Sequence, residues 1–197
     1  HEGLLNIKKT KELIIDFRRN KTPLQPLTIN NETVEQVHSY KYLGVTIDDT
    51  LDWSIHASIT YKKAQKRMFF LRKLNNFRID ITLMSLFYLS TIESILTFCI
   101  TCWGGNVKCQ DKLKFDRLIR KAGKIVRTNF PPLDSLYITC CSRKIDQIIS
   151  EPLHPLAPQI KFSPRSNRPI LFPCKTERYR RSFLPSSIKL LKPPRSV

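Results

Sequence analysis

The spacing of apolar residues along the chain changes character at Trp53. Before that residue, short apolar runs alternate with polar side chains and are rich in residues that favour strands. We predict strands over residues 11–18, 27–29, 33–37 and 40–47. The Asn30-Asn31 pair is expected to form a tight hairpin turn between the second and third strands. Gly44 interrupts the last strand, which often marks a bulge or a close backbone approach.

After Trp53 the apolar residues recur at helical spacing. We predict helices over residues 57–74, 81–103, 111–127 and 134–150. Asp80 is expected to cap the second helix at its N-terminus. This helix carries Glu93 as its only charge, so it is predicted to be the central and most buried element. The helical block therefore predicts a basic bundle of three or four helices.

Residues 151–197 hold nine of the 13 prolines and ten basic residues against two acidic ones. We expect this tail to be extended or partly disordered, with one short helix over 186–191 that docks on the bundle. The fold class predicted from the whole pattern is α+β, a small antiparallel sheet followed by the basic helices and the Pro-rich basic tail. The expected division is a partial sheet domain over 1–53, a helical domain over 54–150 and the tail over 151–197.

The formal net charge of +18 is unevenly placed. Residues 1–56 carry seven basic and eight acidic side chains, whereas residues 57–197 carry 27 basic and eight acidic ones. A basic half of this kind is an electrostatic footprint for phosphate backbones. A solvated basic face and an anionic membrane surface are the alternatives, because positive charge fixes attraction to polyanions but not the identity of the partner.

Several features bear on the cellular setting and on metal binding. The chain starts with His1 rather than Met, which we interpret as an excerpt or a truncated reading frame. No stretch of 18 or more uninterrupted apolar residues predicts a membrane span, and no secretory signal is evident, so an intracellular location, nuclear or cytoplasmic, is expected.

Cys99-x-x-Cys102 is the only zinc-like pair among six cysteines, and buried inert thiols are the expected state.

A set of short motifs, in this order and spacing, resembles the end of the palm and the thumb of reverse transcriptases from non-LTR (LINE-type) retrotransposons. The resemblance rests on Leu5-Asn6-x-Lys8-Lys9-Thr10-Lys11, Leu13–Phe17, Tyr42-Leu43-Gly44-Val45, Leu51-x-Trp53-x-x-His56, Lys63–Arg67, Phe70–Leu74, Phe87-Tyr88, Ile92–Leu96 and Trp103-Gly104-Gly105. It covers nearly the whole chain. It implies a fragment of an RNA-directed DNA polymerase whose partners would be an RNA or DNA template-primer and the remainder of the polymerase.

The resemblance also implies what this chain lacks. The two-metal carboxylate pair and the nucleotide-binding fingers of that family would lie upstream of residue 1. Asp48-Asp49 follows the last strand, and we interpret it as a pair of turn residues rather than as the catalytic pair. We therefore expect no polymerisation by this chain alone and no cofactor of its own, although the parent family would use Mg²⁺.

Three groups of residues are candidates for contact with nucleic acid. The resemblance places Lys8, Lys9 and Lys11 after the catalytic hairpin, where a lysine faces the incoming triphosphate or belongs to a solvated turn. It places Tyr42, Leu43 and Gly44 in a primer grip, with packing of a sheet edge as the alternative. The basic faces of two helices would follow a duplex by phosphate contact, or serve solubility only. They comprise Lys62, Lys63, Lys66, Arg67, Arg72, Lys73, Arg117, Arg120, Lys121 and Lys124.

Other aromatic and imidazole side chains have less direct interpretations. Trp53 and His56 are expected to pack or cap the junction between sheet and helix. Aromatic residues in the tail alternate with arginines, which suits stacking on single strands and equally suits a tail wrapped on the bundle. They are Phe162, Phe172, Tyr179 and Phe183.

A second resemblance concerns Lys62 to about Glu93. This stretch distantly resembles the helical segment at the N-terminus of AlkB-homologue tRNA-modifying enzymes, which combine an iron/2-oxoglutarate oxygenase with a methyltransferase. The iron-binding set of two His and a carboxylate is not recognisable in the sequence, nor is a Gly-rich loop for S-adenosylmethionine. A third alternative is a stand-alone helical RNA-binding module, which predicts an independently folding bundle over 57–150.

Overall fold

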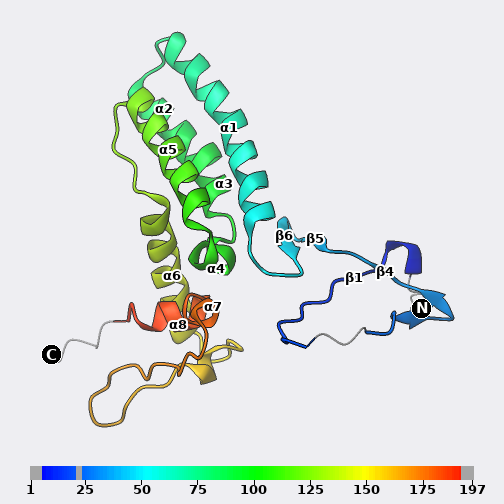
Figure 1. Cartoon of the computed structure of the whole chain (residues 1–197). Coiled ribbons are helices and arrows are strands. Elements are labelled where there is room, and N and C mark those ends of the chain that lie inside the picture. Colours follow the sequence, from blue (N-terminus) through cyan, green and yellow to red (C-terminus); the bar gives the residue numbers. More distant parts are fainter. Residues whose placement is uncertain (1–5, 21–23, 192–197) are drawn as a thin grey trace. The chain divides into compact units, whose positions relative to one another are not determined.

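The computed structural model describes residues 6–20 and 24–191, and the chain divides into two units, residues 1–56 and 57–197 (Figure 1). The described strands lie in the first unit, and the helices from α1 onwards make up the second. The protein is therefore α+β, as the sequence predicts. The tail, predicted as a separate region, falls within the second unit.

The strands form three separate two-stranded ladders. β1 (Lys11–Glu12) pairs in parallel with β4 (Glu35–Gln36), directly after the short 3₁₀ turn η1 (Ile7–Lys9). β2 (Thr28–Ile29) pairs antiparallel with β3 (Glu32–Thr33). The single antiparallel sheet of the sequence prediction is therefore wrong, and the strand predicted over 11–18 keeps only two residues. Its alternation is broken at Ile14, and ladders this short bury little apolar surface.

Backbone conformation at two turns explains the hairpins. Asn30 and Asn31 have φ values of 50° and 62°, which confirms the predicted tight turn. Leu43 and Gly44 also have positive φ, 45° and 89°, so the chain reverses there between β5 (Ser39–Tyr42) and β6 (Val45–Asp48). The prediction of one strand over 40–47 is wrong, because Gly44 marks a turn with left-handed backbone rather than a bulge.

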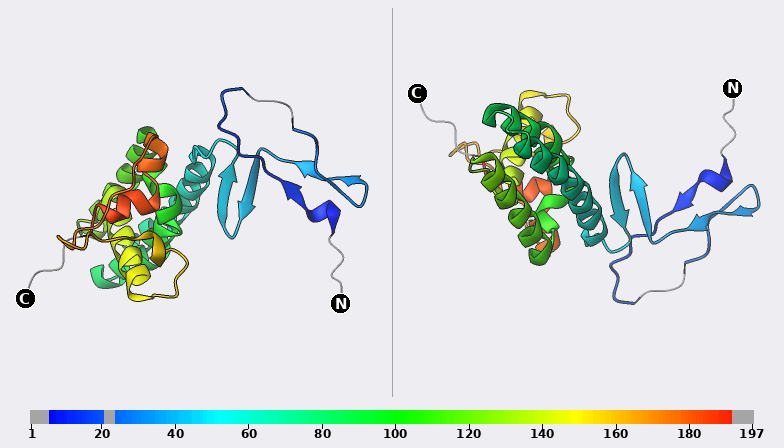
Figure 2. Two further views of the ribbon diagram at one scale, coloured as in Figure 1. Left: turned by 90° about the horizontal axis from the view of Figure 1, so that it is seen from below. Right: turned by 90° about the horizontal axis from the view of Figure 1, so that it is seen from above.

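Three long helices dominate the second unit. They are α1 (Ser54–Asn76), α5 (Cys109–Val126) and α6 (Leu133–Ser150), close to the predicted bounds. Figures 1 and 2 show them clustered with the shorter helices α2 to α4. Phe115 of α5 joins this core, with its ring centroid 5.9 Å from Tyr61 and 6.1 Å from Trp103. Leu113 of the same helix is exposed and lies outside this core.

The helix predicted over 81–103 is interrupted. It runs through α2 (Ile81–Phe87), the π-helical turn η2 (Tyr88–Glu93) and α3 (Ser94–Thr97). Asp80 caps α2 as predicted, since its carboxylate accepts the Thr82 N–H at 2.8 Å. The chain then breaks at Cys99, which has left-handed backbone, before α4 (Ile100–Trp103) and the 3₁₀ turn η3 (Gly104–Asn106). A continuous helix is therefore the wrong prediction beyond Thr97.

The burial of this segment follows a stripe with a period of four residues. Its buried members are Met84, Tyr88, Ile92, Leu96 and Ile100. A straight α-helix would rotate such a stripe out of register, and the wider π turn keeps it facing the core. The opposite face, with Leu83, Leu86 and Leu89, is exposed, so the segment predicted to be the central and most buried element buries one face only.

The segment Ile81–Asn106 is long and apolar enough to cross a membrane, although the sequence pattern did not predict one. Only 28% of its most apolar window is buried within the fold. Length and composition are shared by membrane spans and by core helices. Within this segment, the left-handed residue Cys99 separates α3 from α4.

The tail packs on α6 instead of lying free. Ile145 and Ile148 of α6 form a buried cluster with Ile160 and Ile188. Ile188 ends α8 (Phe183–Ile188), which starts three residues before the predicted helix and follows α7 (Glu177–Arg180). A 3₁₀ turn, η4 (Ala157–Gln159), precedes Ile160. The aromatic rings of the tail at positions 162, 172 and 183 pack against this cluster, which favours the wrapped tail over single-strand stacking.

Candidate nucleic-acid interface

A groove lies between α1 and α5, with a volume of about 250 Å³. It is lined by one stripe of each helix: Tyr61, Gln65, Met68 and Arg72 from α1, and Lys114, Arg117, Leu118 and Lys121 from α5. Both stripes follow helical spacing, so each presents one face of its helix to the groove. Met68 and Leu118 are buried at its floor, and the cations stand exposed around it.

The groove is cationic without a compensating acid among its lining residues. Lys114 pairs with Asp111 one turn earlier on α5, with Nζ and Oδ1 2.7 Å apart. The neighbouring Asp116 carboxylate points elsewhere, because it accepts the Leu133 N–H at the start of α6 at 2.9 Å. Arg72, Arg117 and Lys121 have no ion pair with any residue that the structure describes. Three cations are therefore free to meet an anion.

The predicted basic residues of the helices separate into three places. Arg72, Arg117 and Lys121 line the groove, and Arg67 and Lys73 line a second groove on the other side of α1. The remaining ones, Lys62, Lys63, Lys66, Arg120 and Lys124, are exposed outside both linings. Sequence reasoning did not single out Gln65 or Lys114, although both share the helical spacing of the residues beside them.

The candidates in the first unit have a different setting. Tyr42, Leu43 and Gly44 end one strand and turn the chain into the next, and the Leu43 side chain is 77% exposed. Lys9 is exposed, whereas Lys11 forms an ion pair with Glu35 across the β1–β4 ladder. The side chain of Lys8 lies outside what the structure describes. The two units are described separately, so these residues and the groove are not assigned to one site.

The junction residues pack as predicted. The His56 ring is buried and accepts the Thr46 N–H at Nδ1, 3.2 Å away. The Trp53 ring meets it edge-on at 6.5 Å. Asp48 is a turn residue, since its Oδ1 accepts hydrogen bonds from the backbone N–H, at 3.0 Å, and the hydroxyl of Thr50. The adjacent Asp49 carboxylate bonds His38 Nδ1 at 2.9 Å.

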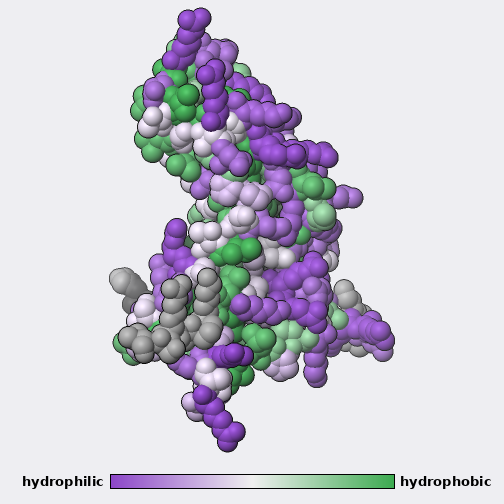
Figure 3. All heavy atoms as spheres, turned by 90° about the vertical axis from the view of Figure 1, so that its left-hand side faces the viewer, coloured by the Kyte–Doolittle hydropathy of each residue, from purple (hydrophilic) through white to green (hydrophobic). Residues whose placement is uncertain are grey.

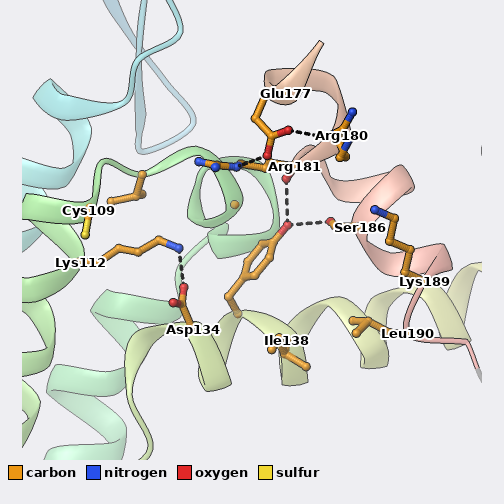
Figure 4. Close-up of a pocket in the computed structure, with 13 residues that line it drawn as sticks. Cys109, Lys112, Asp134, Ile138, Glu177, Arg180, Arg181, Ser186, Lys189 and Leu190 are labelled. Atoms are coloured by element: carbon orange, nitrogen blue, oxygen red, sulfur yellow. Dashed lines mark hydrogen bonds and ion pairs between the residues drawn. The ribbon is translucent and has the colours of Figure 1, made fainter. Parts of the chain in front are cut away.

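A larger pocket of about 690 Å³ lies where α7 and α8 meet α6 (Figure 4). Its cations are largely neutralised within the fold. Lys112 pairs with Asp134 at 2.6 Å, while Arg180 and Arg181 share Glu177, each at 2.8 Å. The Tyr137 hydroxyl, whose pKa is raised by burial, bonds Ser186 Oγ at 2.9 Å. A polyanion therefore meets less uncompensated charge here than in the groove between α1 and α5.

The cysteines do not assemble a metal site in the described part of the chain. No group of three His, Cys, Asp or Glu side chains there is arranged to hold a metal ion. Cys99, Cys102 and Cys109 are exposed thiols, so the expectation of buried thiols is wrong for them. The left-handed turn at Cys99 brings the pair to the surface. Cys141 is buried, and burial raises the pKa of its thiol.

One family model matches the chain. It describes the N-terminal region of the alkylated DNA repair protein alkB homolog 8, and it matches residues 53–94, which are 42 of the 197 residues. The matched stretch contains α1, α2 and η2, and so one wall of the groove, but not α5. No match was found among curated proteins or among solved structures. The comparisons thus agree with the second resemblance, and none points to a reverse transcriptase.

Proposed function

We propose that the helical unit binds nucleic acid through its phosphate backbone, without reading sequence, in the groove between α1 and α5. The observation that carries this proposal is the gathering of Arg72, Lys114, Arg117 and Lys121 around one groove whose lining contains no carboxylate. Phosphate contacts position a protein on a strand and supply the sequence-independent part of its affinity.

The family match supports the same class of ligand. The matched family takes its name from a repair protein of alkylated DNA, whose substrate is a nucleic acid. The match includes α1, which forms one wall of the groove, and it concerns an N-terminal region rather than a whole enzyme. We therefore propose a binding module, similar over α1 and α2 to that region, rather than an oxygenase.

The test is a salt titration. Fluorescence anisotropy of the full chain with labelled duplexes of unrelated sequence would be measured from about 50 to 200 mM salt. Each phosphate neutralised contributes about −0.9 to the slope of log affinity against log salt. If all four groove cations bind phosphate, the slope is about −3.6, and affinity falls about 150-fold across this range.

A matched pair of double variants separates the groove from charge in general. Arg117→Gln with Lys121→Gln should lower the slope by about two for every duplex. Arg143→Gln with Lys144→Gln removes the same charge from the exposed face of α6 and should change the slope little. Equal effects of the two pairs, or a strong preference for one sequence, would show that the groove is not the binding site.

The resemblance to a reverse-transcriptase fragment remains a second proposal. The observation in its favour is local: the β5–β6 hairpin, with Leu43-Gly44 at its turn, leads through Asp48 and Trp53 directly into basic α1. Under this proposal the first unit supports a primer end, and the chain alone does not extend a primer. Extension of a primed RNA template by the purified chain with Mg²⁺ or Mn²⁺ would contradict it.

A further inference from the structure

A second groove lies on the other side of α1, between that helix and the α2–η2 segment. Its volume is about 360 Å³. The lining comprises Arg67, Phe70, Lys73 and Leu74 from α1, Phe77 directly after that helix, and Phe87 and Thr91 from the α2–η2 segment. This groove is separate from the cationic groove, because α1 presents a different face to each neighbour.

Exposed aromatic rings line this groove. Phe77 is 75% exposed and Phe70 is 48% exposed, while Phe87 is partly buried. Figure 3 shows that apolar residues, in green, are also exposed elsewhere, among hydrophilic ones, on the face of the molecule that it draws. Aromatic rings left in water in this way offer a flat apolar face to a flat ligand.

Positive charge borders the rings. Arg67 and Lys73 are exposed, and the lining contains no carboxylate. Lys73 also contacts Phe69, a ring outside the lining, with Nζ 5.6 Å from the ring centroid, a distance typical of a cation–π contact. An apolar protein segment that filled the groove would have to bury these two charges without partners. A ligand with both a flat apolar ring and a negative charge can stack on the aromatic rings and pair with the two cations.

We propose that this groove holds an unpaired base of a single-stranded nucleic acid, with the base stacked on Phe70 and Phe77 and the flanking phosphates at Arg67 and Lys73. The inference rests on the proposed function and deepens it, since it names a second mode of contact on the same helical unit. Stacking on aromatic rings tolerates any base, because every base has a π-face. The helical unit then binds duplex on one side of α1 and unpaired strand on the other.

The experiment compares strands with and without bases. Affinities of the full chain would be measured for a short single-stranded RNA, a DNA of the same sequence, the same strand with abasic sugars at its central positions, and a duplex. Phe77→Ala should weaken binding of both base-bearing single strands roughly tenfold, within the range expected for one lost stacking contact. Its affinity for the abasic strand and for the duplex should stay unchanged.

Two further variants serve as controls for this experiment. Leu83→Ala removes another exposed apolar side chain, outside the groove, and should change none of these affinities. Phe77→Trp should retain binding, and its fluorescence should be quenched by a base-bearing strand more than by the abasic one. A large loss for RNA but not for DNA would identify RNA as the source of the base.

The outcomes separate this inference from the proposed function. Equal loss for base-bearing and abasic strands, or no loss with Phe77→Ala, overturns the base site while the salt-dependent binding of duplex stands. If the affinity of the wild-type chain for duplex does not depend on salt concentration, the proposed function itself is overturned.

Discussion

The hydroxyl of Tyr137 on α6 lies 2.9 Å from Oγ of Ser186 on α8, and it also bonds the carbonyl oxygen of Arg181 at 3.3 Å. Two residues 49 positions apart are thereby joined, so the tail is fixed to the helices by polar contacts as well as by apolar packing. Ser186 Oγ keeps further partners, since it donates to the carbonyls of Ser182 or Phe183.

Tyr137→Phe should loosen the tail without unfolding the helices. The variant loses the hydroxyl bonds, which together contribute about 1–2 kcal/mol, but keeps the buried ring. Limited proteolysis should cut the variant within residues 160–182 faster than the wild-type chain, with a small fall in thermal midpoint. Tyr179→Phe, at an exposed ring whose hydroxyl bonds no residue that the structure describes, provides the control. Equal rates of cleavage would contradict the anchoring role.

Asp48→Ala should destabilise the turn that precedes α1. The Asp48 carboxylate is buried and accepts the Thr50 N–H and hydroxyl, and its loss leaves these donors without their partner. We expect a cost of about 1–3 kcal/mol in the free energy of unfolding, measured with urea. Asp48→Asn retains an oxygen acceptor and should lose less. An Asn variant as unstable as the Ala variant would show that the charge, rather than the acceptor, stabilises the turn.

Glu93→Gln should stabilise the protein at neutral pH but not at acid pH. Burial raises the pKa of the Glu93 carboxyl, and its Oε2 has no hydrogen-bond donor among the described residues. The folded state therefore holds this proton more tightly than the unfolded state. The resulting stability is fully present below the unfolded pKa, near 4.5, and is lost as pH rises through the raised folded pKa.

The check is a set of urea unfolding curves for wild type and Glu93→Gln from pH 4 to pH 8. The difference in free energy of unfolding should be near zero at pH 4 and should grow with pH in favour of the variant. Asp146→Asn makes the same change in net charge at an exposed site of α6 and should show no such growth. A constant difference at all pH values would rule out the titration of Glu93 as its cause.

Gly123→Ala should destabilise α5 although alanine favours helices. A Cβ at position 123 would lie 2.5 Å from the carbonyl oxygen of Thr128, where the chain turns back after the helix. We expect a net loss of about 1–3 kcal/mol, seen as a lower thermal midpoint. Arg127→Gly, at the end of the same helix, is the variant to compare with Gly123→Ala. Arg127 ends the helix with φ 56°, and glycine at this left-handed position should be tolerated or mildly stabilising. A rise in the midpoint of Gly123→Ala would contradict the close approach.

The helices were predictable where side chains repeat with a clear period. Asp80 allowed the start of α2 to be predicted. The basic and apolar faces of α5 are distinct enough that the predicted bounds of this helix lie within two residues of the observed ones. The break at Cys99 was not predictable, because nothing in an apolar stretch marks a non-glycine residue with left-handed backbone. At the break, the Trp103 indole N–H donates to the Phe98 carbonyl oxygen, 2.9 Å away.

The candidate site was predictable in composition but not in arrangement. Sequence spacing placed Arg72 and Arg117 on the basic faces of two helices, but it could not say that these faces border one groove. Which side of α1 meets α5, and which meets α2, is decided by packing of buried residues such as Met68 and Leu71. The exposed ring of Phe77 gave no signal, because an apolar residue beside a helix end is usually assigned to the core.

The place of Ile188 in the buried cluster bears on how the protein is made. Ile145 and Ile148 emerge from the ribosome some forty residues before the side chain that covers them, so α6 leaves this face open until Ile188 has been added to the chain. A chain terminated after residue 182 would keep that face in water for its whole life, and exposed apolar faces of this kind drive association. The last dozen residues of the described chain thus determine whether the newly made helices remain separate from one another or aggregate.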